Sequence, residues 1–228
     1  MLALNNCKKP SNVPENQNAC IIGCEDATDN DYEDLVFLVY GKFSINEPEE
    51  VFATITKRYM VEDLGSTDDF DFNDIVVDVS QTEKTTYYYV IDSEKGEKTL
   101  ANTEGPVVVS QKAVVRAAGG ILDFTINIGS SSWTKSEHLT PFDQMMNTGI
   151  GSAIDYNAVL DQFNIENKDW NPETNNITIS VVGRGNNAGV QVIPFPKEGE
   201  IPMIIAVDPT WNWMSERQSV PADWFTTK

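Results

Sequence analysis

Apolar and polar residues alternate in short runs along most of the chain. In the run VFATITKRY, Val51, Ala53 and Ile55 fall on one face of an extended chain, whereas Thr54 and Thr56 fall on the other. This period of two is typical of a half-buried antiparallel strand. Similar runs rich in Val, Ile, Thr and aromatic residues occupy 35–40, 86–91, 106–115, 121–128, 176–182, 190–195 and 203–207. Because Gly, Pro, Asn and Asp separate them, the sequence predicts an all-β fold, an antiparallel β-sandwich.

Other segments predict the parts between the strands. Residues 141–147 (PFDQMMN) form the clearest helix candidate, with Pro at a first-turn position and Gly149 as a stop. Residues 92–105 and 166–176 are polar and rich in turn formers, so we expect long loops there. No low-complexity linker divides the chain. We therefore expect an extension or boundary segment over residues 1–20 and a single domain over residues 21–228.

An acidic motif occurs twice. Each copy has a Glu-Asp pair, a short spacer, then Asp-x-Asp-aromatic-x-Asp and an apolar run. The first copy contains Glu25, Asp26, Asp29, Asp31 and Asp34, and the second contains Glu62, Asp63, Asp69, Asp71, Asn73 and Asp74. Because there are two copies and no third, the pattern indicates a paired motif and not a solenoid.

Side-chain parity predicts how the second motif folds. If residues 69–79 were one strand, Asp69 and Asp71 would share a face with Ile75 and Val77, and neither face would be apolar. A loop that ends near residues 73–74, with a strand beginning there, removes this conflict. Several carboxylates would then converge without a nearby Arg or Lys and repel by about 1 kcal/mol or more per close pair. We therefore expect a cation among them.

The pattern Asp-x-Asp-x-Asn is how many calcium loops begin, because Ca²⁺ prefers six to eight oxygen ligands. The rest of an EF-hand is missing: Asp74 stands where that loop has Gly, and Ser80 where it has Glu. The remaining ligands could come from Glu62 and Asp63 or from the other copy of the motif. In the alternative, the carboxylates cap turns by accepting backbone N–H groups and hold no metal.

Charge and cysteine content exclude several classes. With 16 basic and 35 acidic residues, the formal charge is −19, which disfavours nucleic acid and anionic membrane surfaces as partners. Cys7, Cys20 and Cys24 lack a CxxC pair, so zinc and iron–sulfur sites are not expected. The sequence contains no apolar run long enough for a membrane helix, and residues 1–10 lack the apolar length of a signal peptide.

The aromatic residues raise a second kind of site. The tryptophans are Trp133, Trp170, Trp211, Trp213 and Trp224. Trp211 and Trp213 would share one face of a strand, which favours packing in the core, whereas Trp170 lies in a polar loop and is our candidate for contact with a glycan. His138 is the only His, and no nucleophile pattern lies beside it, so catalysis has little support.

The second motif, EDLGSTDDFDFNDIVVDV, closely resembles the signature of the LruC-type domain of surface and secreted proteins of Gram-negative bacteria. The resemblance extends through residues 136–149, 171–217 and 220–225, and so covers residues 50 to 228. The first motif is similar to an Asp-rich, calcium-associated motif of a related β domain. The resemblance implies an exported, often lipid-anchored protein with a jelly-roll-like fold and no established enzyme activity. A lipid-attachment site has a small residue directly before its Cys, whereas Asn6 stands before Cys7 in this chain.

Together these observations predict a non-catalytic, extracytoplasmic surface module, stabilised by Ca²⁺, that binds a glycan or a cell-surface protein as an adhesin or a structural domain. One alternative is an extracellular carbohydrate-active enzyme. The other is a purely structural domain whose carboxylates cap turns.

Overall fold

The computed structural model describes residues 2–5, 18–24, 35–41, 43–45, 48–64, 70–92, 94–185, 187–218 and 220, the first four ranges by their backbone alone. The chain forms two compact units. One comprises Met1–Val51 and Lys84–Val107, and the other comprises Phe52–Glu83 and Val108–Lys228. This division differs from the expected extension over residues 1–20 followed by a single domain, since strand β2 (Asn18–Cys24) crosses the expected boundary.

The first unit contains a three-stranded antiparallel sheet of β1 (Leu2–Asn5), β2 and β3 (Leu35–Gly41), in that order. Its strand β4 (Phe43–Ile45) pairs with the last residues of β6 (Ile75–Asp92). β7 begins at Lys98 and ends at Ala117. The polar loop expected over residues 92–105 is therefore shorter, because residues 98–105 belong to a strand.

Cross-strand polar pairs explain why that polar segment is extended. Lys98 Nζ donates to Glu49 Oε2 at 2.9 Å and lies 3.7 Å from the centroid of the Tyr89 ring. The Tyr88 hydroxyl donates to Glu104 Oε2 at 2.9 Å. Opposite charges and aromatic rings facing each other across strands stabilise a sheet without an apolar core.

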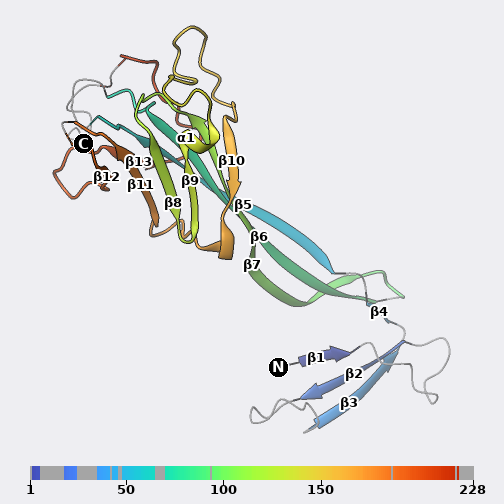
Figure 1. Cartoon of the computed structure of the whole chain (residues 1–228). Helices are drawn as coiled ribbons and strands as arrows, with labels where there is room; N and C mark the ends of the chain where they lie inside the picture. The colour runs from blue at the N-terminus through green and yellow to red at the C-terminus, as the bar shows by residue number, and fades with distance from the viewer. Residues whose placement is uncertain are drawn as a thin grey trace. The chain divides into compact units, whose positions relative to one another are not determined.

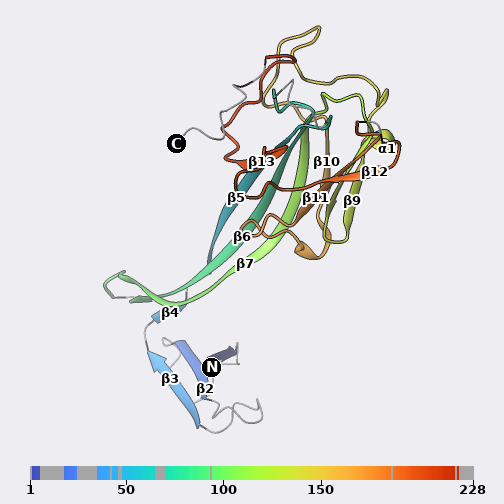
Figure 2. The same ribbon diagram turned by 90° about the vertical axis from the view of Figure 1, so that its left-hand side faces the viewer.

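The second unit is a sandwich of two sheets (Figures 1 and 2). The larger sheet has the order β10-β7-β6-β5-β13, and the smaller sheet, which lies across one of its faces, has the order β12-β11-β8-β9. The strands not yet located are β5 (Glu49–Val61), β8 (Phe124–Ile128), β9 (Ser131–Thr134), β10 (Asp161–Asn164), β11 (Ile177–Val182), β12 (Val190–Ile193) and β13 (Ile204–Val207). The predicted all-β, antiparallel sandwich is thus confirmed.

The core lies between the two sheets and follows the predicted alternation. Ile75, Val77 and Val79 of β6 pack with Ile126 of β8 and Ile179 of β11 in one buried cluster. The apolar side chains that alternate along these three strands therefore meet at the sandwich interior, as the period of two requires. On β5 the predicted face is buried only at Tyr59 and Val61, whereas Val51 and Ile55 are 44% and 41% exposed.

In the described part of the chain, the helices are α1 (Lys135–His138) and a 3-10 turn at Glu166–Lys168. The helix predicted over residues 141–147 is absent, and that segment forms turns. Its backbone bonds to another segment and not to itself, because Met146 exchanges two backbone hydrogen bonds with Ala118, the residue after β7, at 2.9 and 3.1 Å.

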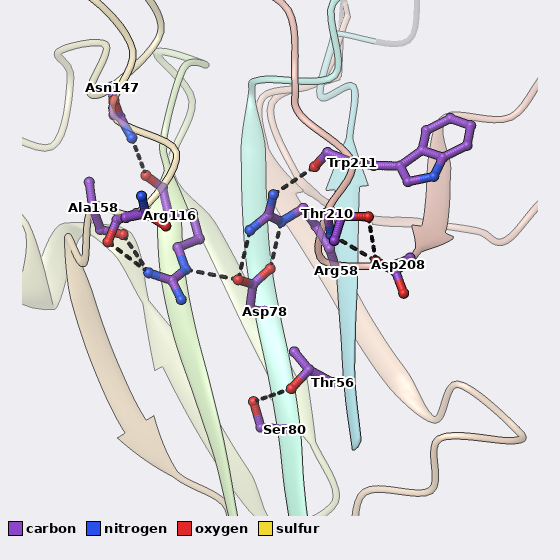
Figure 3. A network of polar contacts seen from close by, with 11 residues as sticks. Thr56, Arg58, Asp78, Ser80, Arg116, Asn147, Ala158, Asp208, Thr210 and Trp211 are labelled. Carbon is purple, nitrogen blue, oxygen red and sulfur yellow. Dashed lines mark hydrogen bonds and ion pairs between the residues drawn. The ribbon is translucent and has the colours of Figure 1, made fainter. Parts of the chain in front are cut away.

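The outer face of the larger sheet carries a buried polar network (Figure 3). Asp78 on β6 accepts two hydrogen bonds from Arg58 on β5, at 2.7 and 2.9 Å, and one from Arg116 on β7 at 2.8 Å. Arg58 Nη1 also donates to the Trp211 carbonyl at 2.6 Å, and its guanidinium lies 5.2 Å from the centroid of the Trp213 ring. Three neighbouring strands and the loop after β13 are thereby tied together.

Candidate functional site

The structure brings together part of the predicted acidic site. Glu62 and Asp63 directly follow β5, and Asp71, Asn73 and Asp74 directly precede β6. The Asp63 N–H donates to Asp74 Oδ2 at 2.8 Å, and the Phe72 N–H donates to Glu62 Oε1. The second motif therefore lies at a loop-to-strand junction, as its parity predicts. Five predicted residues, Glu25, Asp26, Asp29, Asp31 and Asp34, lie outside the described residues, as does Asp69.

Some of these carboxylates do what the turn-capping alternative predicts. Asp71 accepts the Asn73 N–H through Oδ1 at 3.3 Å and the Arg217 N–H through Oδ2 at 2.8 Å. Glu62 and Asp74 each accept a backbone N–H as well. Capping by these three side chains fixes the loop against the strand end and against residue 217.

Other oxygens at the junction are buried without hydrogen-bond partners among the described residues. They are Asp63 Oδ1, Asp63 Oδ2, Asn73 Oδ1 and Thr148 Oγ1, which we call the unpaired oxygens. Asp63 and Asn73 are both 0% exposed. Burying a carboxylate without partners costs several kcal/mol, so turn capping does not account for Asp63 or for the Asn73 amide oxygen.

The unpaired oxygens gather around a pair of glycines after β7. A Cβ on Gly120 would lie 1.8 Å from Asp63 Oδ2, and one on Gly119 would lie 2.1 Å from Asn73 Oδ1 and 2.8 Å from Thr148 Cγ2. The Gly119 N–H donates to the Asn73 and Asp74 carbonyls at 3.1 and 2.9 Å. Only glycine permits so close an approach between this segment and the acidic loop.

The acidic side chains line a cavity of about 200 Å³ beside these glycines. Its wall includes Glu62, Asp63, Asp71, Asp74, Glu216 and Arg217. The sequence reasoning missed Glu216 and Thr148, which lie about 70 residues or more from the motif along the chain. The signal that could have found the glycines is the Gly-Gly pair placed directly after a strand in RAAGG.

Burial shifts the pKa values of two neighbouring carboxyl groups strongly. It raises the pKa of Asp63 to about 6, although the charge of Lys135, a side-chain hydrogen bond with Asp74 and the charge of Arg184 oppose the shift. Burial and then the charge of Asp63 raise the pKa of Asp74 to about 7. Near neutral pH these two carboxyls therefore hold protons more tightly than ordinary aspartates do, which is the behaviour of acids brought together at low dielectric.

Lys135 supplies a positive charge near the cluster that the sequence reasoning did not anticipate. It is 0% exposed, and its ammonium donates to the Gly120 carbonyl at 2.6 Å. Burial lowers the pKa of this amine, and the charges of Asp63, Asp123 and Asp74 oppose that effect. Lys135 and Arg184, whose charge also acts on Asp63, partly balance the acidic groups, but the five carboxyl groups of the cavity wall outnumber them.

Across the described ranges, no three His, Cys, Asp or Glu side chains are grouped tightly enough to hold a metal ion as they stand. The donor set does fit Ca²⁺ in its chemistry, since the segments after β5, before β6 and around Thr148 offer carboxylate, amide and hydroxyl oxygens. Asp63 and Asn73 would hold such an ion through their unpaired oxygens, with Glu62, Asp71, Asp74 and Glu216 nearby on the cavity wall.

The predicted glycan contact at Trp170 is not supported by its position. This side chain is 2% exposed, and its indole N–H donates to the Tyr59 hydroxyl at 3.1 Å, so it is a core residue. The prediction for the Trp-x-Trp pair is also wrong in part. Residues 211–213 do not form a strand, so Trp213 is fully buried while Trp211 is 58% exposed.

Comparison of the chain with protein family models, with characterised proteins and with solved structures gave no significant match. Among the helices in the described ranges, none has the length and apolarity needed to cross a membrane.

Proposed function

We propose that this chain is a non-catalytic, extracytoplasmic surface module of the LruC type whose fold is stabilised by Ca²⁺ at the junction of β5 and β6. In this proposal the module binds a glycan or a surface protein. The observation that carries it is the buried Asp63 carboxyl group, whose two oxygens accept no N–H or alcohol hydrogen bond in the described part of the chain and whose side-chain partner is another acid, Asp74. A divalent cation would offset both the burial of that charge and its repulsion from Asp74.

The excess of acidic residues supports the same proposal. The chain has a formal charge of −19, and the cavity wall carries five carboxyl groups beside one arginine. A field of this sign draws divalent cations toward the cavity. Calcium is favoured over magnesium because the available ligands are several, derived from the protein and carried on loops.

Thermal unfolding with and without calcium tests the proposal. At a calcium concentration a hundred times the dissociation constant, binding to the folded state alone stabilises it by about 2.7 kcal/mol. We therefore expect the melting temperature to rise on adding CaCl₂ to chelator-treated protein, and metal analysis of the purified protein to find calcium. Asp63→Asn and Asp71→Ala should each lose most of this rise.

Asp92→Asn is the matched control. Asp92 is the last residue of β6, where its Oδ1 accepts the Glu94 and Lys95 N–H groups at 2.8 and 3.2 Å, and an Asn side chain retains that acceptor. This variant should keep the full calcium response. A melting temperature indifferent to millimolar calcium and to chelator would falsify the proposed metal site.

An extracellular hydrolase is the second candidate, favoured by the raised pKa values of Asp63 and Asp74 beside a cavity. Two carboxyl groups would both have to reach the substrate, however, and one of this pair, Asp63, is 0% exposed. Assays of polysaccharide hydrolysis in calcium and in chelator separate the two candidates, since a surface module releases no reducing ends under either condition.

A further inference from the structure

A second hollow of about 200 Å³, which is mostly apolar, shares Asp71 with the acidic cavity. Trp211, Met214, Met60 and Phe72 contribute to its wall, and Asp71 and Asn212 are its polar members. We call it the Trp211 groove. Its wall combines a broad aromatic surface with the exposed amide of Asn212, and apolar walls with a few polar groups are the usual composition of a small-ligand site.

Trp211 is fixed through its backbone while its ring stays in solvent. Its carbonyl accepts a hydrogen bond from Arg58 Nη1 at 2.6 Å, and its N–H donates to the Asp208 carbonyl at 3.0 Å. Figure 3 shows the indole pointing away from the polar network that holds its backbone. An indole that is 58% exposed contributes little to folding, but in this arrangement it presents a flat apolar face to a ligand.

Asn73 connects the acidic junction to this groove. Its Nδ2 donates to the Met214 carbonyl at 3.2 Å, while its Oδ1 is one of the unpaired oxygens and lies against Gly119. Asp71 adds a second link, because its carbonyl accepts the Met214 N–H at 3.0 Å and its Oδ2 accepts the Arg217 N–H at 2.8 Å. A cation held by Asn73 Oδ1 would fix the amide orientation that Met214 depends on.

We propose that the Trp211 groove binds a neutral sugar ring and that bound Ca²⁺ keeps the groove in its binding conformation through Asn73. This inference rests on the proposed calcium site. A sugar ring has an apolar face that suits the exposed indole of Trp211 and hydroxyl groups that suit the exposed amide of Asn212. Negative charge on Asp71 and on the nearby Asp208, within a chain of charge −19, disfavours acidic sugars and other anions.

An array of neutral and acidic oligosaccharides, probed with the full chain in calcium and in chelator, tests the groove. We expect binding to neutral oligosaccharides in calcium, and Trp211→Ala should weaken that binding about tenfold or more, as expected when an aromatic stacking partner is removed. Phe142→Ala is the matched control, since Phe142 is also an exposed aromatic residue, at 40%, and lies outside the groove. This variant should bind like the parent chain.

Two variants of Asn73 test the coupling. Asn73→Asp keeps an oxygen for the cation but removes the donor to Met214, so its melting temperature should still rise with calcium while its sugar binding weakens about tenfold. Asn73→Ala removes both functions and should lose both responses.

Each contrary outcome overturns a stated part of the proposal. Binding to acidic oligosaccharides only, or no binding to any oligosaccharide by protein that melts normally in calcium, overturns the neutral-sugar assignment. Sugar binding unchanged by Trp211→Ala overturns the groove. A melting temperature that rises with calcium while sugar binding persists in chelator overturns the coupling alone, whereas a melting temperature indifferent to calcium overturns the proposed calcium site itself.

Discussion

Gly119 and Gly120 approach the acidic junction more closely than any residue with a side chain could. Asp63 Oδ2 occupies the place where a Cβ on residue 120 would stand, and Asn73 Oδ1 does the same at residue 119. The main chain of the two glycines therefore lies directly against these oxygens. Because these oxygens accept no N–H or alcohol hydrogen bond in the described part of the chain, they keep the capacity to bind a cation.

Replacing Gly120 with alanine tests that packing. The added methyl group would overlap Asp63 Oδ2, so we expect Gly120→Ala to lower the free energy of unfolding by about 2 kcal/mol, within the range for overpacked sites. Urea denaturation measures the change. Gly189→Ala is the control, since a Cβ there would meet only Asn187 Oδ1, at 3.3 Å, and should change stability far less. Equal effects of the two substitutions would contradict this account.

The raised pKa values of Asp63 and Asp74 predict how stability depends on pH without calcium. Both groups bind protons more tightly in the folded chain, with pKa values of about 6 and 7, than at their ordinary value of 3.8. Their contribution to stability is therefore fully present below about pH 4 and is lost as the pH rises through 6 to 7. In chelator, we expect a lower free energy of unfolding at pH 8 than at pH 5.

Calcium should reduce or reverse that difference, because the cation binds the ionised carboxylates that predominate at pH 8. Urea denaturation at both pH values, with and without calcium, gives the four values needed. The Asp63→Asn, Asp74→Asn double variant removes both titrating groups. In chelator, its free energy of unfolding should fall less between pH 5 and pH 8 than that of the parent chain. A fall of the same size in the double variant would assign the pH dependence to other groups.

At the level of the elements, Asp78 connects three strands through its contacts with Arg58 and Arg116. Arg58 and Asp78 are 3% exposed, so both charges are removed from water. Such a buried network adds little compared with apolar packing, but removal of its shared member leaves unpaired charges. The network therefore fixes the alignment of β5, β6 and β7 more than it adds to their stability.

Asp78→Ala is expected to lower the free energy of unfolding by about 3 to 5 kcal/mol, because it leaves the Arg58 charge buried without its carboxylate. Ser80→Ala, two residues further along β6, removes only the acceptor of the Thr56 hydroxyl at 3.1 Å and should cost about 1 kcal/mol. Urea denaturation of both variants makes the comparison. Similar costs would show that the ionic network is no more important than a single hydroxyl pair.

Local pattern predicted the strands of this chain well and the irregular segments poorly. The alternation around Ile75 and Val77 located β6 and the junction before it, because strand periodicity is encoded within a few residues. The approach of Lys135 and Gly120 to Asp63 joins segments about 72 and 57 residues apart, which no local pattern encodes. The prediction that Trp211 packs in the core was wrong for a related reason. Side-chain parity applies only inside a strand, and residues 211–213 form a loop that is held by hydrogen bonds to distant residues such as Arg58.

For the whole molecule, the formal charge of −19 destabilises the folded state by repulsion between like charges, and it also attracts cations. Between about 0.01 M and 1 M salt, the screening length falls from about 30 Å to about 3 Å, so NaCl should raise the melting temperature of chelator-treated protein gradually. Calcium should act at far lower concentration and depend on Asp63. If NaCl at equal ionic strength matched the effect of calcium in a melting experiment, general screening would explain the stabilisation.

The solvent exposure of Trp211 gives the chain an optical property. Trp133, Trp170 and Trp213 are 1%, 2% and 0% exposed, so their indoles should fluoresce at shorter wavelengths and resist collisional quenchers. Trp211, at 58% exposure, should contribute the red-shifted and readily quenched part of the emission from these four residues. Subtracting the spectrum of Trp211→Phe isolates that part without a dye or a label. A ligand that covers the indole would then shift the difference spectrum to shorter wavelengths.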